Sequence, residues 1–192
     1  MALILRGLAL VVFALSLAGC GVQSIPQSQN DVEAALAEVT NQYKRRADLI
    51  PNLVNTVKGY AAHESETLEA VIAARAKATS MTIDPSNLDA QQIQQFQAAQ
   101  GGLSQALGRL MVVAERYPDL KADRNFRELQ AQLEGTENRI NVARTRFNDA
   151  SRTYNTKIRT FPANLFANTF GFTAKPYFEA EAGSEAAPKV KF

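Results

Sequence analysis

Few residues in this 192-residue chain have side chains that could do chemistry. The single histidine, His63, precedes Glu64, but the second histidine of a zinc-protease helix is missing four residues on. The single cysteine, Cys20, can form no intramolecular disulfide. No serine lies in the glycine-flanked turn that exposes a catalytic nucleophile. We therefore interpret His63 as a structural or surface histidine and predict no metal site.

Carboxylates are more frequent, and they lie along helical patterns (Glu64, Glu66, Glu69, Glu128, Glu134 and Glu137). Pairing two of them for acid–base catalysis would need the core of a helical bundle, where an unpaired charge is costly. Gly101 and Gly102 have neither the preceding strand nor the lysine of a phosphate-binding loop, and a helix irregularity or a tight helix crossing explains them. We predict that the protein is not an enzyme and has no cofactor.

Basic residues gather late in the chain. Between Arg139 and Arg159 there are six basic residues and one acid, Asp149. One interpretation is a basic face for a polyanion, a lipid surface or an acidic protein. The other is salt bridging between helices, with part of the charge suiting the end of a helix. The net charge of +2 is too small to indicate a nucleic-acid partner or a membrane partner held by bulk electrostatics.

Long helices must position these groups. From Val32 to Arg75, apolar residues recur in steps of three and four, which predicts one helix from Asp31, its N-cap, to about Ser80. Pro51 leaves the carbonyl of Ala47 without its usual donor. Either the helix continues with a kink, the carbonyl being solvated or bonded by a neighbouring side chain, or it breaks and Asp48 caps a new helix. Because the spacing shows no phase jump, we favour the kink.

The rest of the chain predicts further helices. A turn at 81–88 precedes a helix at 89–116, residues 117–122 break it, and Asp123 caps a third helix that ends near Thr160. A short fourth helix at 164–170 closes at Gly171. Residues 173–192 resemble a largely disordered tail in which Tyr177 and Phe178 would dock first. The expected fold is all-α, an up-and-down antiparallel bundle of three long helices and a short fourth within residues 31–172.

The N-terminus has the features of a targeting segment. Arg6 precedes an apolar run, Gly7 to Leu17, that is short for a membrane-spanning helix. Leu17-Ala18-Gly19-Cys20 resembles the lipobox of bacterial lipoproteins. We predict a signal peptide at 1–19, acylation of Cys20 and a tether without helix at 20–30; the alternative is an uncleaved anchor helix. Both place the protein in the cell envelope, facing the periplasm or the exterior, and by resemblance to enterobacterial sorting Gly21 favours the outer membrane.

Several motifs together resemble the LemA family of membrane-anchored helical proteins. They follow the family's order through the chain: Arg45 to Val54, Gly59 to Glu64, Tyr117 to Leu120, Thr136 to Ile140, Ala143-Arg144 and Phe161-Pro162. The resemblance implies a membrane-anchored helical fold, and the family has no established biochemical reaction.

The candidate site residues are structural polar or interface residues. They are Arg46, Asp48, Pro51, Asn52, Glu64, Arg75, Glu137 and Arg144. If the first and third helices run parallel with level ends, Glu64 and Arg144 lie at the same height, so we predict that these two form a buried ion pair.

The sequence thus predicts a scaffold or partner-binding module. The expected partners are the membrane through Cys20, an unidentified envelope protein and a second copy of the chain. The alternative function is membrane shaping, with a basic helix face on anionic lipid.

Overall fold

Every regular element is a helix in the computed structural model, which describes residues 2–85 and 88–179, with side chains from residue 24 onward. The helices are α1 (Ala2–Tyr60), α2 (Ser65–Ser80), α3 (Ala90–Glu115), α4 (Pro118–Ala122), α5 (Arg124–Arg159) and α6 (Ala163–Phe170). The all-α prediction is confirmed for these residues, but the number of helices is not.

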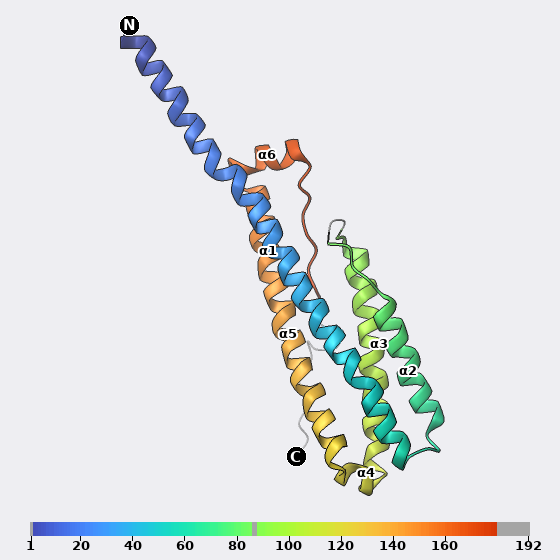
Figure 1. Ribbon diagram of the computed structural model, residues 1–192. Helices are drawn as coiled ribbons and strands as arrows, with labels where there is room; N and C mark the ends of the chain where they lie inside the picture. The colour runs from blue at the N-terminus through green and yellow to red at the C-terminus, as the bar shows by residue number, and fades with distance from the viewer. Residues whose placement is uncertain (1, 86–87, 180–192) are drawn as a thin grey trace, which may run out of the picture.

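Two antiparallel helix pairs form the molecule (Figure 1). The longer pair is α1 with α5, and the shorter pair is α2 with α3. Residue numbers rise along α1 as they fall along α5: Ser24 contacts Lys157, Arg46 contacts Glu137, and Tyr60 contacts Asp123. The first and last of the long helices therefore run in opposite directions.

The predicted continuous helix from Asp31 to Ser80 is wrong, because the chain reverses after Tyr60. Residues 61–64 form the turn, in which Ala61 is buried and its N–H still bonds the carbonyl of Val57. Gly59, just before the turn, weakens the helix by about 1 kcal/mol relative to alanine. Reversal lets α2 pack along α3, with Leu68 and Val71 in the core. The bundle thus has four longer helices and two short ones, not three and one.

The apolar stripe of the sequence is confirmed as the core. The positions from Val32 through Val71 that we placed on it are buried. The buried side chains divide into two clusters, one around Leu53, Leu103 and Phe126, the other around Val39, Phe96 and Phe147. A polar layer separates them, and the candidate site is built on it.

The segment 20–30 is helical, which corrects the expected tether. α1 runs through it, so Asp31 is not an N-cap. Ile25 and Ser28 are each 1% exposed and belong to the packed part of the molecule. Cleavage after Gly19 and acylation of Cys20 stay predictions, since the Cys20 side chain lies outside the described ones. Within the part of the chain whose side chains are described, no helix combines the length and apolar character needed to cross a membrane.

Two predicted helix ends are confirmed. Asp123 caps α5 by accepting a hydrogen bond of 2.8 Å from the N–H of Phe126. That bond lowers the pKa of Asp123, and a further bond that Tyr60 donates to it raises the pKa of the Tyr60 phenol. Gly171 ends α6 with φ +73°, a conformation that favours glycine.

The start of the expected disordered tail is ordered. Residues 173–179 run extended against the bundle, and Phe178 is 4% exposed. Docking of Phe178 is as predicted, whereas the disorder of this part is not. The remainder of the predicted tail, 180–192, lies outside the described residues.

Candidate binding groove between α3 and α5

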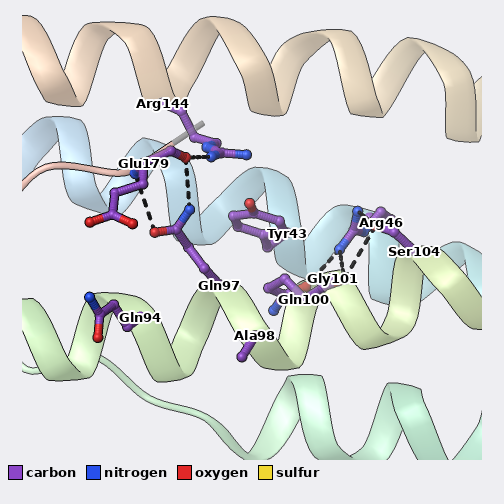
Figure 2. A pocket seen from close by; sticks show the side chains of 10 residues that line it. All are labelled: Tyr43, Arg46, Gln94, Gln97, Ala98, Gln100, Gly101, Ser104, Arg144 and Glu179. Carbon is purple, nitrogen blue, oxygen red and sulfur yellow. Dashed lines mark hydrogen bonds between the residues drawn. The ribbon is translucent and has the colours of Figure 1, made fainter. Parts of the chain in front are cut away.

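The two helix pairs leave a groove between α3 and α5. Tyr43 and Arg46 of α1 lie at its floor, and Figure 2 shows them behind the residues of its walls. A cavity of about 400 Å³ opens there, bounded at one end by Glu179. On the far side of Arg46 the groove continues as a second cavity of about 380 Å³, beside Gly108 and Met111.

Arg46 is the centre of this groove, and it is 3% exposed. Its Nη1 donates to Glu137 Oε2 at 2.8 Å and to Ser104 Oγ at 3.0 Å. Its Nη2 donates to the side-chain oxygen of Gln100 at 2.8 Å and to the main-chain oxygen of Gln100 at 3.2 Å. The guanidinium carbon lies 5.0 Å from the centre of the Tyr43 ring. One side chain therefore joins α1, α3 and α5.

The sequence places this polar residue on the apolar face. Arg46 follows Tyr43 by three residues and precedes Ile50 by four, so it lies on the same stripe. A buried charge needs a partner and full hydrogen bonding, and an arginine can supply several donors in a fixed plane. With Gln100 and the fully buried Thr136, Arg46 forms the polar layer between the two core clusters.

Pro51 lies in an unbroken α1, so the continuous alternative is confirmed and the capped break is not. The carbonyl of Ala47, which lost its helical donor to Pro51, accepts a hydrogen bond of 2.8 Å from Arg75 Nε. Ala47 is 3% exposed, so solvent cannot satisfy this carbonyl. Arg75 of α2 thus replaces the missing main-chain donor and joins the two helix pairs.

Replacing Arg75 with alanine is expected to cost about 1–3 kcal/mol of unfolding free energy, because a buried carbonyl loses its partner. In a Pro51→Ala background the new N–H can bond that carbonyl, so the same replacement should cost clearly less. Pro51→Ala alone should hold or raise the melting temperature. Denaturant unfolding of the four proteins measures the coupling, with the exposed Lys77→Ala as control. Equal costs of Arg75→Ala in both backgrounds would contradict this assignment.

Side-chain amides hold the extended C-terminal segment by its backbone. Asn155 donates to the carbonyl of Lys175 and accepts from its N–H, both at 2.8 Å. Asn148 does the same for Phe178, at 2.9 and 2.8 Å. Gln97, from α3, makes the third such pair with Glu179, at 3.0 and 3.3 Å. The groove therefore binds an extended chain much as a neighbouring strand would.

The spacing of the two asparagines explains their fit. Seven helical residues separate Asn148 from Asn155, a rise of about 10.5 Å. Three extended residues separate Lys175 from Phe178, about 10 Å. Helix and segment stay in register over two contacts because these lengths agree. Neither asparagine was a candidate in the sequence, although both follow a buried aromatic residue seven positions apart.

Phe178 fills an aromatic pocket between the walls. Its ring meets Phe147 at 5.1 Å and Phe96 at 6.4 Å between centres, both edge to face. The guanidinium of Arg144 lies 5.6 Å from the ring centre and donates to the carbonyl of Glu179. The segment is thus fixed by one buried aromatic anchor and by main-chain bonds.

The predicted pair of Glu64 and Arg144 is wrong. Glu64 lies in the turn after α1, where Arg116 Nη2 is 3.0 Å from its carboxylate and Tyr117 donates a hydrogen bond to it. Arg144 is engaged with the C-terminal segment instead. The prediction assumed parallel first and third helices, and the chain reversal after Tyr60 removes that premise.

The other predicted residues divide clearly. Arg46, Glu137 and Arg144 contribute to the groove, and Arg75 and Pro51 lie beside its floor. Asp48 and Asn52 are exposed and take no part in the Arg46 network. His63 is exposed too, and the described residues hold no cluster of three or more His, Cys, Asp or Glu side chains suited to a metal ion.

The basic stretch of α5 makes contacts within the chain. Arg152 pairs with Asp149 at 2.8 Å, and Arg139 donates to the hydroxyl of Thr136. Lys157 and Arg144 donate to main-chain carbonyls of Ser24 and Glu179. Four of the six basic residues are thus engaged inside the molecule, and not all of this charge is available to a partner.

The paired glycines of α3 mark neither a helix irregularity nor a tight crossing. α3 is continuous through both, and a Cβ added at either would meet nothing within 4 Å. Gly101 lines the groove, whereas its neighbour Gly102 does not. Glycine at these exposed positions costs helix stability, and at Gly101 it leaves this part of the groove wall without a side chain.

Comparisons with known proteins point to one family. Residues 35–192 match the LemA family. Over 157 residues the chain is 25% identical to Protein LemA of Metamycoplasma hominis, covering 80% of this chain and 67% of that protein. It is 36% identical over 87 residues to magnetosome protein MamQ 1 of Paramagnetospirillum magneticum and 37% over 86 residues to MamQ of Magnetospirillum gryphiswaldense.

The MamQ alignments span 45% and 44% of this chain and only 32% of either relative's length. The family match, by contrast, extends over all the bundle helices from within α1 onward, and the relative from Metamycoplasma hominis aligns over most of the same region. The chain belongs to the LemA family.

Proposed function

We propose that this LemA-family protein is a non-enzymatic scaffold, attached to the membrane of the cell envelope, that holds an extended segment of a partner protein in the groove between α3 and α5. The observation that carries the proposal is the binding of residues 175–179 through amide pairs to their backbone. Recognition of this kind gives affinity for an extended chain, while side-chain pockets give specificity.

The groove has the parts that such a site needs. Amide pairs at Asn155, Asn148 and Gln97 bond the backbone of the segment. Among the described residues, their one hydrogen bond to a side chain of the segment is that of Asn155 with the Tyr177 hydroxyl, so they can hold other extended chains as well. The pocket of Phe96 and Phe147 selects an aromatic anchor. Cavities lie on both sides of Arg46 beside the bound segment. A partner's segment with an aromatic residue would therefore compete with the chain's own.

Attachment to the membrane rests on the N-terminal sequence. The apolar run from Gly7 to Leu17 and the cysteine that follows are typical of an exported, lipid-anchored chain. α1 connects that region to the bundle without a break. The groove would thus be presented at a fixed distance from the bilayer, as suits a scaffold.

Photo-crosslinking in intact cells tests the groove. A photoreactive amino acid replaces Gly101, which lines the groove, and the same residue at Gly102, which does not, is the matched control, because both glycines are exposed with open space around them. The Gly101 variant should yield a discrete product with one other protein, and the joined peptide should map to a single aromatic-containing segment of it. The Gly102 variant should yield little of that product.

Equal products from both positions would indicate nonspecific proximity and contradict the proposal. A product made only with a second copy of this chain would contradict the scaffold role and favour a homo-oligomer. No product at either position, with protein present at normal levels, would also count against a groove partner.

A further inference from the structure

The short helix α6 leaves large apolar side chains in water. Phe161, Leu165 and Phe170, at and just before this helix, are 75%, 58% and 66% exposed. α6 is attached to the bundle through Ala167, which is 1% exposed and packs in the core cluster around Val39, Phe96 and Phe147, with Phe172 beside it. α6 is therefore fixed to the bundle at Ala167, while Leu165 and Phe170, about 140° apart around the helix axis, are both exposed.

α6 lies beside α1 at the point where α1 leaves the bundle toward the N-terminus (Figure 1). Lys157, at the end of α5, donates to the carbonyl of Ser24 in α1, which fixes the height of this end. Cys20 precedes Ser24 by four helical residues, about 6 Å along the axis. Whatever surface receives the N-terminal region must pass close to α6.

The charge at this end is mainly positive. From Ala150 to Phe178 the chain contains four basic residues and no acid, although Lys175 is buried and Arg152 pairs with Asp149. The residues of α1 at the same height, 24–30, carry no charge. Arg159 is exposed here. Aromatic and aliphatic side chains next to cations are the combination that binds the surface of an anionic bilayer.

We propose that α6 is an interfacial membrane helix, which inserts Phe161, Leu165 and Phe170 among the lipids of the bilayer that holds the N-terminus. This inference rests on the membrane attachment in the proposed function, and it adds a second contact that fixes the bundle's orientation. The lipid-binding surface is thus the α6 end and not the long face of α5, whose basic residues are largely engaged within the chain.

Fluorescence of single-tryptophan variants tests this placement, since the chain has no tryptophan of its own. Phe170→Trp and Leu165→Trp place the probe on α6, and Val112→Trp, at a site 67% exposed on α3, is the control. The full chain is reconstituted in vesicles of phosphatidylethanolamine and phosphatidylglycerol with brominated acyl chains. Both α6 variants should shift to shorter emission wavelength and lose most of their emission to bromine quenching. The Val112→Trp variant should show neither change.

Co-sedimentation with the vesicles distinguishes membrane attachment of the chain from insertion of α6. If the chain co-sediments but the α6 variants are quenched no more than Val112→Trp, the interfacial helix is refuted and the anchor stands. A shift to shorter wavelength without quenching would mean that a second copy covers α6, which also refutes it. If the chain does not co-sediment, the membrane attachment fails, and the assignment of α6 fails with it.

Discussion

Arg46→Ala is expected to lower the free energy of unfolding by about 3 kcal/mol, because it removes the cation of a largely buried pair and leaves its partners without donors. The side-chain oxygen of Gln100 and the carboxylate of Glu137 lose the bonds from Arg46, whereas the main-chain oxygen of Gln100 keeps the bond that it accepts from Ser104 Oγ. The side chain of Glu137 is 40% exposed and can bond water instead. The expected loss of unfolding free energy therefore lies at the lower end of the range for buried pairs. Denaturant unfolding followed by circular dichroism measures the loss.

Arg45 is the matched control for this replacement. It has the same residue type, lies one position earlier in α1 and is exposed. Arg45→Ala should change the free energy of unfolding by no more than about 0.5 kcal/mol, as surface substitutions usually do. Arg46→Lys should recover only part of the stability, since an ammonium group cannot reproduce the planar set of donors. Equal losses for Arg45→Ala and Arg46→Ala would contradict the central role of Arg46.

The sequence predicted which residues are buried better than it predicted where the chain turns. Val57, Ala61, Leu68 and Val71 stay in phase through the reversal, because the turn after Tyr60 spans about one helical turn of residues. Periodicity reports which face of a helix is apolar, and both helices bury that face. It therefore could not distinguish one long helix from two antiparallel ones. Gly59 was the local signal of a break.

The groove was partly predictable. Arg46 was a candidate polar or interface residue, although its burial was not predicted, and the unpaired carbonyl of Ala47 indicated that a neighbouring side chain could replace the missing donor. The identity of that donor, Arg75, depends on the reversal of α2, which local patterns do not reveal. The amide pairs to residues 175–179 were not predicted. An extended segment has no helical periodicity in its sequence, so it cannot be distinguished from a disordered tail without knowing which side chains lie beside it.

Replacing Phe178 with alanine is expected to release residues 173–179 from the groove while the helices stay folded. Truncating a buried phenylalanine typically costs about 3–5 kcal/mol, and here the loss falls on the docking of one segment. The amide hydrogens of Lys175, Phe178 and Glu179, which bond Asn155, Asn148 and Gln97, report docking directly.

Their hydrogen exchange should become about 100-fold faster or more, at about 1.4 kcal/mol for each factor of ten. Exchange in the middle of α3 and α5 should stay close to that of the unchanged protein. Tyr177→Ala is the control, since Tyr177 is exposed and contributes a single hydroxyl contact to Asn155. If Phe178→Ala accelerates exchange no more than Tyr177→Ala, Phe178 is not the anchor.

Once Phe178→Ala has released residues 173–179, the groove should bind the same segment supplied as a separate peptide. A synthetic peptide of residues 173–179 should bind the Phe178→Ala protein and restore slow side-chain amide exchange at Asn148 and Asn155. The unchanged protein should bind the peptide much more weakly, because its own segment occupies the site. Adding Asn148→Ala to Phe178→Ala should abolish binding, since the amide pair at the aromatic anchor is lost. Binding that survives Asn148→Ala undiminished would show that the peptide is held by its side chains alone, and backbone recognition would have to be abandoned.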